Sequence, residues 1–283
     1  MAHRIHRGGE MHWVGDGFPV RSVFSYNGLG QELSPFLLMD YAAPYEFTPT
    51  TQRRGVGAHP HRGFETVTIC YQGEIEHRDS FGGGGKIGPG DVQWMTAASG
   101  LLHDEFHSPE FAAKGGTFEM IQLWVNLPAK NKNAEPGYQT LLKDSIPTVE
   151  IAGGAGSMRV IAGSYNGQNG PARTFTPVHI WDGSLNAGGE VTLSITPGYS
   201  TVVLVLRGEL DFEGEQVMVG DLIQVDSEAN QVTLTASSDA KFVVLSGQPL
   251  NEPIIGYGPF VMNTEQEIQQ AFADFRAGKM GSL

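Results

Sequence analysis

The sequence predicts an all-β protein of two jelly-roll barrels in tandem, with one helix near its C-terminus. Two observations carry this prediction: short apolar runs separated by turn residues, and a pattern that occurs in both halves of the chain. The 283 residues include 38 glycines and 16 prolines, which punctuate the apolar runs without a collagen-like period. Hydrophobic residues make up 40% of the chain and charged residues 17%, so a packed core is expected.

The N-terminal half divides into an irregular part and a strand-rich part. Residues 1–50 hold few clear periods, and we expect them to be irregular apart from a short strand at 20–26. Between 56 and 126 the chain has closely spaced apolar runs that end at turns. The strands expected there are 66–71, 74–78, 92–95, 101–106 and 118–125.

The C-terminal half begins after a segment of linker composition and ends in a helix. A second strand-rich stretch covers about 158–246. A helix is predicted at 265–277, because Thr264 and Glu267 form a capping box and Gly278 stands at its exit. The domain boundaries expected from this organisation are a first barrel domain at 1–130, a linker at 131–147 and a second barrel domain at 148–283.

Each half repeats the order apolar strand, Gly-acidic turn, Gly-Asp turn. The first half has Gly73-Glu74 and later Gly90-Asp91, and the second half has Gly208-Glu209 and later Gly220-Asp221. The longer spacing in the first half is what the glycine run 82–85 would add to a hairpin loop. The repeat therefore predicts an internal duplication, which is typical of tandem barrels.

Charge and cysteine content exclude several classes of function. A formal net charge of −13 argues against direct binding to nucleic acid or to an anionic membrane surface. No apolar run approaches the ~20 residues of a membrane-spanning helix, and no signal peptide is recognisable, so we expect a cytoplasmic, soluble protein. Cys70 is the single cysteine, which rules out an intrachain disulfide, and its apolar run favours a buried structural role.

Two pairs of donor residues predict a metal site. His59 and His61 are two apart, as are His103 and Glu105, and residues two apart on a strand face the same side. If the two strands face each other, three imidazoles and one carboxylate converge. We expect these four residues to bind one divalent metal ion.

The donor types restrict the metal without selecting it. Imidazole and carboxylate together suit Fe(II), Mn, Co, Ni, Cu or Zn, whereas Mg and Ca prefer shells made of oxygen alone. Four protein ligands on an octahedral ion leave two open positions, which allow a catalytic role. No organic cofactor site is predicted, because the glycine run 82–85 lacks the lysine and the following helix of a phosphate-binding loop.

Other donor residues rank lower. Glu65 is an alternative ligand or a supporting acid, and His179 stands alone in the second half. His77, His107 and Glu119 are expected to be peripheral, with a supporting role left open. At the offsets of the four donors, the second half has only hydroxyl residues, so we expect one metal per chain; these residues are Ser194, Thr196, Thr233 and Thr235.

Four stretches together resemble the pirin family. They are His59-Pro60-His61-Arg62-Gly63-Phe64-Glu65-Thr66-Val67, the run from Gly88 to Ala97, His103-Asp104-Glu105, and Gln122 to Leu127. The end of the chain, from Gly247 to Ile254 and from Gly258 to Thr264, is also similar to pirins. The resemblance implies a fold of two cupin barrels with a metal, usually iron, in the N-terminal one. It implies ligation by His59, His61, His103 and Glu105 and lowers the weight on Glu65.

The resemblance implies two alternative functions. Several pirins open the ring of a flavonol with dioxygen, as quercetin 2,3-dioxygenases; others act as redox-responsive regulators that bind protein partners. For the enzyme we expect a small aromatic substrate, dioxygen, and Fe(II) in preference to Mn, Ni, Co, Cu or Zn. Glu105 is the expected catalytic residue, either as a lasting ligand or as a base that detaches to take the substrate's proton. Phe64, Trp94 and Met95 could line the cavity or belong to the barrel core.

Overall fold

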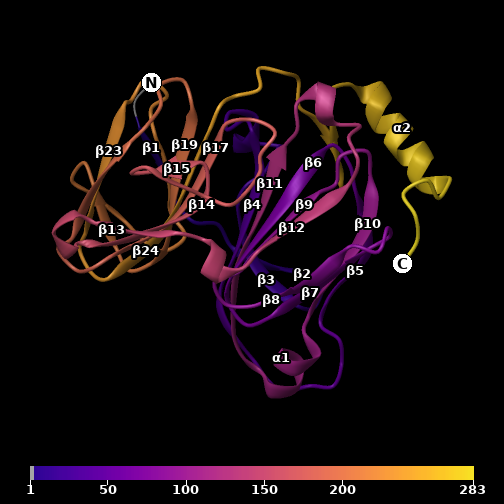
Figure 1. Cartoon of the computed structure of the whole chain (residues 1–283), viewed down its shortest axis with the longest axis horizontal. Coiled ribbons are helices and arrows are strands. Elements are labelled where there is room, and N and C mark those ends of the chain that lie inside the picture. The colour runs from indigo at the N-terminus through magenta and orange to yellow at the C-terminus, as the bar shows by residue number, and fades with distance from the viewer. Residues whose placement is uncertain (1–2) are drawn as a thin grey trace. The chain divides into compact units, whose positions relative to one another are not determined.

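The computed structural model describes residues 3–283 and separates them into two compact units (Figure 1). The first barrel unit consists of Glu10–Gln31, Phe36–Lys143 and Leu250–Leu283. The second barrel unit consists of residues 3–9, Glu32–Pro35 and Asp144–Pro249. The two units are interleaved along the chain, whereas the domains expected from the sequence were continuous.

The first barrel unit has a seven-stranded and a four-stranded antiparallel sheet. The larger sheet contains, in spatial order, β12 (Gly137–Leu141), β9 (Val92–Thr96), β6 (Phe64–Gln72), β11 (Gly116–Asn126), β4 (Phe36–Phe47), β3 (Phe18–Phe24) and β2 (Met11–Val14). The smaller sheet contains β5 (Gly55–His61), β10 (Leu101–His107), β7 (Ile75–Asp79) and β8 (Gly84–Ile87). All five strands expected between 56 and 126 are confirmed, each within two residues at its ends.

The second barrel unit repeats this arrangement of seven and four strands, which confirms the predicted pair of barrels. Its larger sheet contains β1 (Arg4–His6), β22 (Leu222–Gln224), β19 (Ser200–Arg207), β24 (Ala240–Gly247), β17 (Val178–Leu185), β14 (Gly156–Ala162) and β13 (Thr148–Ile151). Its smaller sheet contains β18 (Glu190–Ser194), β23 (Gln231–Ala236), β20 (Leu210–Phe212) and β21 (Glu215–Val217). A short hairpin pairs β15 (Ser164–Tyr165) with β16 (Gln168–Asn169).

The expectation that residues 1–50 are mostly irregular is wrong. β4 runs for twelve residues and pairs with β11 on one side and β3 on the other. Pro44 and Asp40 interrupt its apolar pattern, because neither residue favours a strand. The strand expected at 20–26 is present as β3, two residues earlier.

The segment expected to be a linker contributes a strand to the first barrel unit. β12 pairs with β9 at the edge of the larger sheet, where Tyr138 lies opposite Met95. Residues before and after it have the polar composition that suggested a linker. An edge strand needs partners on one side alone, which is why its sequence carries so weak a signal.

The predicted C-terminal helix is confirmed as α2 (Glu265–Arg276). The Thr264 hydroxyl accepts the Glu267 N–H at 3.2 Å, as expected of a capping box. The Glu267 carboxylate accepts the N–H of Asn263, the residue before the N-cap, at 3.0 Å. Before α2 lies the hairpin of β25 (Ile255–Tyr257) and β26 (Phe260–Met262). A second short helix, α1 (Pro109–Lys114), was not predicted. None of the helices within residues 3–283 is long and apolar enough to cross a bilayer.

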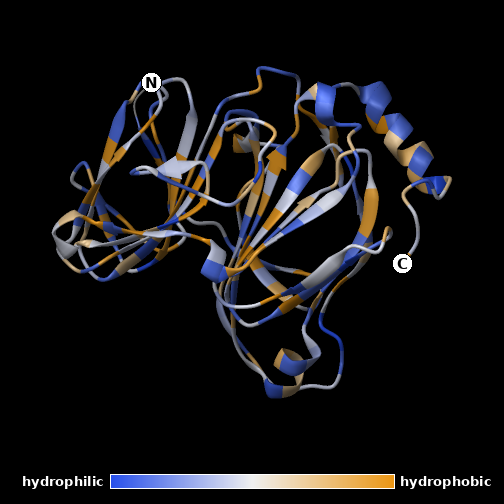
Figure 2. Ribbon diagram, viewed as in Figure 1, coloured by the Kyte–Doolittle hydropathy of each residue, from blue (hydrophilic) through white to orange (hydrophobic). Residues whose placement is uncertain are grey.

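Apolar side chains of the strands form the cores of both units. Figure 2 shows hydrophobic residues along the strands, whereas α2 is mostly hydrophilic with a few apolar positions. The apolar positions of α2 include Ile268 and Ala271, which pack with β26 and with Met280. The segment that ends the chain is thus part of the core of the first barrel unit.

Candidate metal centre

Strands β5 and β10 bring three imidazoles together. His103 lies directly opposite His59 in the antiparallel pair, and Leu101 lies opposite His61. The ring centroid of His103 is 4.2 Å from that of His59 and 4.9 Å from that of His61. Ligand nitrogens of the three rings lie within 4.8 Å of one another, which is the spacing of donors around one ion.

A β-bulge shapes this pair of strands. After His103 and His59, the next paired residues are Glu105 and Val56, so Gly57 and Ala58 together oppose Asp104. Bulges are common beside functional sites because they redirect side chains. Here the carbonyl oxygen of Gly57 lies 2.8 Å from Nδ1 of His59. The His59 ring therefore donates from Nδ1 and keeps the Nε2 lone pair for a ligand role.

The other two histidines are also arranged as metal donors. Nδ1 of His61 faces the carbonyl oxygen of Pro259 at 3.4 Å, which favours Nε2 as its donor atom. Within residues 3–283, neither ring nitrogen of His103 has a hydrogen-bond partner, although the ring is fully buried. A buried polar atom without a partner costs about 1–3 kcal/mol. An ion bound by these nitrogens would remove that cost, so the residues fit a metal.

Glu105 lies in a second cluster that shares His103 with the first. Donor atoms of His77, His103 and Glu105 lie within 4.8 Å of one another. Oε1 of Glu105 is 3.4 Å from Nδ1 of His77, its direct partner on β7. The four predicted donors therefore do not form one mutually close set, because Glu105 turns toward His77. His77 was expected to be peripheral with a supporting role left open, and the structure places it beside the carboxylate.

Burial favours the uncharged forms of the site's titratable groups when no ion is bound. It lowers the pKa of His61 and His103 well below the usual range, and the neighbouring histidines lower both further. Burial also lowers the pKa of His59, against the effect of the Gly57 carbonyl. The pKa of Glu105 is raised to about 7, mainly by burial and secondly by the charge of Asp104. Neutral imidazoles offer the lone pairs that a metal ion needs.

The segment after residue 250 packs against the residues that follow His61. The Val261 N–H donates to the Arg62 carbonyl at 3.1 Å, and the Arg62 guanidinium donates to Asp274 of α2 at 2.7 Å. At Gly63, a Cβ would lie 2.0 Å from the Val261 carbonyl oxygen, and φ is +93°, so only glycine fits. The turn that follows His59 and His61 is thus held in place by residues from the end of the chain.

Lys132 completes this attachment. Its ammonium is buried and donates to three oxygens: the Gly63 carbonyl at 2.7 Å, the Asn126 side chain at 2.6 Å and the Val261 carbonyl at 2.9 Å. One side chain therefore joins the turn after His61, the end of β11 and β26. The sequence prediction missed this residue because an isolated lysine in a polar segment gives no signal.

The remaining donor residues have partners of their own. Glu65 belongs to neither cluster; its carboxylate accepts the Thr96 hydroxyl at 2.6 Å. Glu119 accepts hydrogen bonds from Tyr41 and Gln72 at 2.9 and 2.8 Å. Nε2 of His107 lies 2.9 Å from the Gly17 carbonyl, and Nδ1 of His179 accepts the Ser164 N–H at 3.1 Å. These contacts fit structural roles.

Three aromatic or apolar residues considered as cavity walls are in the core. Phe64 and Trp94 are fully buried, and Met95 is nearly so. Phe64 stacks on Trp124 with ring centroids 4.2 Å apart, and both rings lie about 5 Å from the His61 ring. Phe64 and Trp124 therefore form an apolar wall beside His61. Of these two residues, only Phe64 was singled out from the sequence.

Both donor clusters found among residues 3–283 lie in the first barrel unit. In the second barrel unit, Thr192 lies opposite Thr233, with hydroxyl oxygens 2.9 Å apart. By their distances from the glycine turns, Ser194 and Thr233 correspond to His59 and His103 and would therefore lie opposite each other. That correspondence is off by two residues, because the comparison allowed no gap in this strand.

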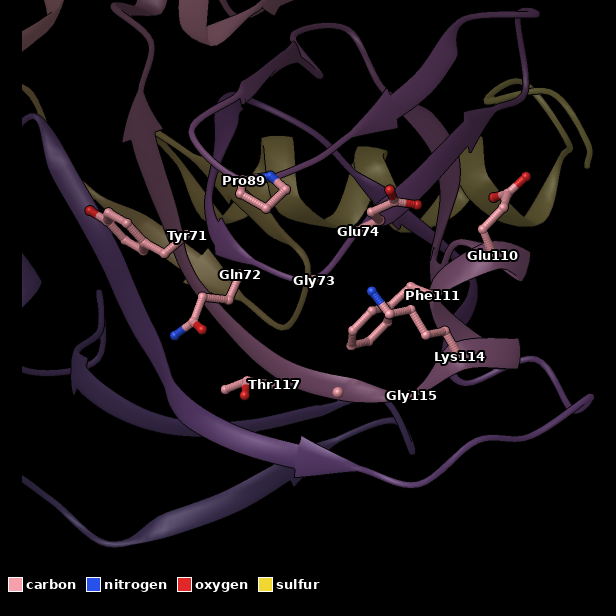
Figure 3. Close-up of a pocket in the computed structure, with 11 residues that line it drawn as sticks. Tyr71, Gln72, Gly73, Glu74, Pro89, Glu110, Phe111, Lys114, Gly115 and Thr117 are labelled. Atoms are coloured by element: carbon pink, nitrogen blue, oxygen red, sulfur yellow. The ribbon is translucent and has the colours of Figure 1, made fainter.

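A separate open groove of about 440 Å³ lies between the β6–β7 turn, α1 and the start of β11. Figure 3 shows Glu110 and Lys114 projecting from α1 at its rim. None of the residues that line this groove belongs to either donor cluster. The groove is thus distinct from the two donor clusters.

Comparison with known proteins places the chain in a family. The pirin model matches residues 17–125, and the model for the pirin C-terminal cupin domain matches residues 180–281. The chain belongs to the pirin family. The two units are accordingly the two cupin domains of a pirin, as the resemblance implied.

Similar proteins include bacterial and human pirin relatives. A Pseudomonas aeruginosa protein named "Putative quercetin 2,3-dioxygenase" is 57% identical over 97% of this chain and 96% of its own length. Human pirin is 37% identical over 89% of this chain and 84% of its own. The crystal structure of a quercetin 2,3-dioxygenase from Acinetobacter baumannii matches with a TM-score of 0.96 at 54% identity, covering 99% of this chain and 97% of that one. These similarities support a dioxygenase of the pirin type.

Proposed function

We propose that this pirin-family protein is a metal-dependent dioxygenase that opens the heterocyclic ring of a flavonol or a similar enolisable aromatic compound. The observation that carries the proposal is the convergence of three imidazoles, two of them buried and one half-buried, next to a buried carboxylate. One of the buried imidazoles, that of His103, has no hydrogen-bond partner within residues 3–283. Relatives named as quercetin 2,3-dioxygenases support the choice of reaction.

His59, His61, His103 and Glu105 would hold one divalent transition-metal ion. Fe(II) is our preferred ion, and the mixed nitrogen and oxygen donors also accept Mn, Co, Ni, Cu or Zn. When bound, the ion supplies a Lewis acid that lowers the pKa of a coordinated hydroxyl group. Glu105 would join such a set through Oε2, the carboxylate oxygen that does not face His77.

The protein's own groups would bind the substrate and move its proton. As a base, the Glu105 carboxylate would accept the proton of the flavonol's enolic hydroxyl, and for this it must lie within hydrogen-bond reach of that proton. The His59 and His61 rings are held by backbone carbonyls, so they keep their orientation as the proton moves. Phe64 and Trp124 exclude water from one side of His61.

The reaction makes the test specific. Opening the flavonol ring takes up one dioxygen, breaks two carbon–carbon bonds of the heterocycle and releases the carbon between them as carbon monoxide, while both oxygen atoms enter the ester product. We expect purified, Fe(II)-loaded protein to consume quercetin and dioxygen in equal amounts and to release carbon monoxide. His61→Ala should lose the metal and the activity, and His179→Ala in the second barrel unit should keep both.

Two results would contradict the proposal. Quercetin turnover that persists in metal-depleted protein would exclude a metal-dependent reaction. Stoichiometric metal binding with no quercetin loss, under anaerobic loading followed by admission of air, would exclude quercetin-type ring opening. In that second case a redox-responsive, partner-binding protein would account for the metal.

A further inference from the structure

His77 shares the interior face of the smaller sheet with the metal donors. β10 lies between β5 and β7, so each of its inward residues has a partner on both sides. His103 lies opposite His59 on β5, and Glu105 lies opposite His77 on β7. His77 is 3% exposed, and on β7 the buried positions alternate with exposed ones. Its side chain therefore points into the barrel toward Glu105.

The contact between His77 and Glu105 has a defined direction. Nδ1 of His77 is 3.4 Å from Oε1 of Glu105, an ion-pair contact that is a few tenths of an ångström too long for a typical N–H···O hydrogen bond and is not one in this structure. Nε2 of His77 is buried without a hydrogen-bond partner within residues 3–283. A neutral imidazole carries one N–H, and here Nδ1 is the nitrogen with an acceptor in front of it. Nδ1 is thus the nitrogen from which the ring can donate to the carboxylate.

We propose that His77 is a positioning residue for the metal centre: its Nδ1–H holds Oε1 of Glu105, so that Oε2 is left for the ion. This inference rests on the proposed function, because it assumes that Glu105 is a ligand. Carboxylates that bind metals are themselves held by hydrogen bonds, and loss of such a partner costs about 10- to 100-fold in metal affinity. With one oxygen held in this way, Glu105 would offer a single oxygen to the ion, which would leave a coordination position open for substrate.

Two features distinguish this role from direct ligation by His77. Its donor atoms are not in the cluster that contains His59 and His61, and its near nitrogen faces a carboxylate oxygen. A histidine whose Nδ1–H donates to Glu105 can bind an ion only through Nε2. Substitutions at position 77 separate the two roles, because asparagine can supply an N–H near the place of Nδ1 but cannot replace an imidazole ligand.

The test uses Co(II), which is redox-stable and reports its coordination in its visible spectrum. The full chain, His77→Asn and His77→Leu are titrated with Co(II) against a competing chelator. We expect His77→Leu to bind Co(II) about 10- to 100-fold more weakly and with a changed spectrum. His77→Asn should recover most of the affinity and the parent spectrum. Thermal unfolding of the metal-free proteins shows whether each variant is folded.

Three results would overturn the inference. His77→Leu that matches the parent in Co(II) affinity and spectrum would show that the contact does not position Glu105. Loss of binding in both variants, as complete as in His103→Ala, would make His77 a ligand. A parent chain that binds no Co(II) would remove the metal centre itself. If the parent binds Co(II) but leaves quercetin intact, the proposed reaction fails while the His77 comparison still stands.

Discussion

At the scale of single residues, the two-residue spacing of His59 and His61 and of His103 and Glu105 was enough to predict that the three histidines lie together. Spacing on a strand fixes the face of the sheet, and both pairs face the barrel interior. The spacing does not fix the distances between the side chains. The bulge at Gly57 and Ala58 and the turn of Glu105 toward His77 depend on packing from three strands, which no local pattern records.

Glu65 should make stability depend on pH. Its side chain is buried, and burial raises its pKa from 4.5 to about 7 despite the Thr96 hydrogen bond. Between those values the folded chain binds more protons than the unfolded chain, so the free energy of unfolding falls as pH rises, by up to about 3 kcal/mol. Glu65→Gln should therefore gain stability over the parent above pH 7 and little at pH 4.5, measured by denaturant unfolding of metal-free protein.

The control for this comparison is Glu10→Gln, which changes an exposed carboxylate. Its stability should follow the parent at every pH. A Glu65→Gln variant whose difference from the parent is constant between pH 4.5 and pH 8 would show that Glu65 does not titrate in that window.

At the scale of elements, residues 250–283, here called the strap, pack against the segment that contains His59 and His61. Lys132 joins this strap to the turn after His61, and removing its ammonium leaves three buried oxygens without their donor. We expect Lys132→Met to lower the free energy of unfolding by about 3 kcal/mol. Amide hydrogen exchange at Val261 should also become faster, because the Val261 N–H pairs with Arg62 within the same attachment.

Lys130→Met is the matched control, since this exposed lysine lies in the same short turn. It should leave both stability and exchange at Val261 unchanged. Equal effects of the two substitutions would mean that the Lys132 hydrogen bonds do not hold the strap.

The elements also show where sequence patterns lose information. The helix α2 was predicted almost to the residue, because its capping box and apolar spacing are local. β4 was missed because Pro44 and Asp40 break its apolar run, although its neighbours β3 and β11 hold it in place. β12 was assigned to a linker because one partner strand suffices for an edge.

At the scale of the whole molecule, the barrel pair was predictable from the repeat, and the interleaving of the units was not. The sequence holds no signal that residues 250–283 return to the first barrel unit, since packing between distant segments leaves no local period. These residues supply core side chains there, among them Ile254 and Val261 beside Phe64. A boundary drawn by composition alone therefore divides one folding unit.

This organisation predicts the behaviour of fragments. A fragment of residues 10–143 should unfold at a lower temperature than the full chain and bind Co(II) weakly, because the strap's core contacts are absent. Addition of a peptide of residues 250–283 should raise both the unfolding temperature of the fragment and its affinity for Co(II). A fragment of 10–143 that alone unfolds cooperatively and shows the full chain's Co(II) spectrum would contradict this.

The contact between His61 and Pro259 also sets an order of events during synthesis. The two residues are 198 positions apart, so the ribosome adds nearly two hundred amino acids after His61 before the carbonyl that orients its ring exists. At bacterial or eukaryotic elongation rates this takes roughly 10–40 s. Throughout that interval the nascent chain carries His59 and His61 without the strap. The arrangement of the three imidazoles is therefore completed only after translation has passed residue 259, and a metal ion delivered earlier would meet an incomplete set of supports.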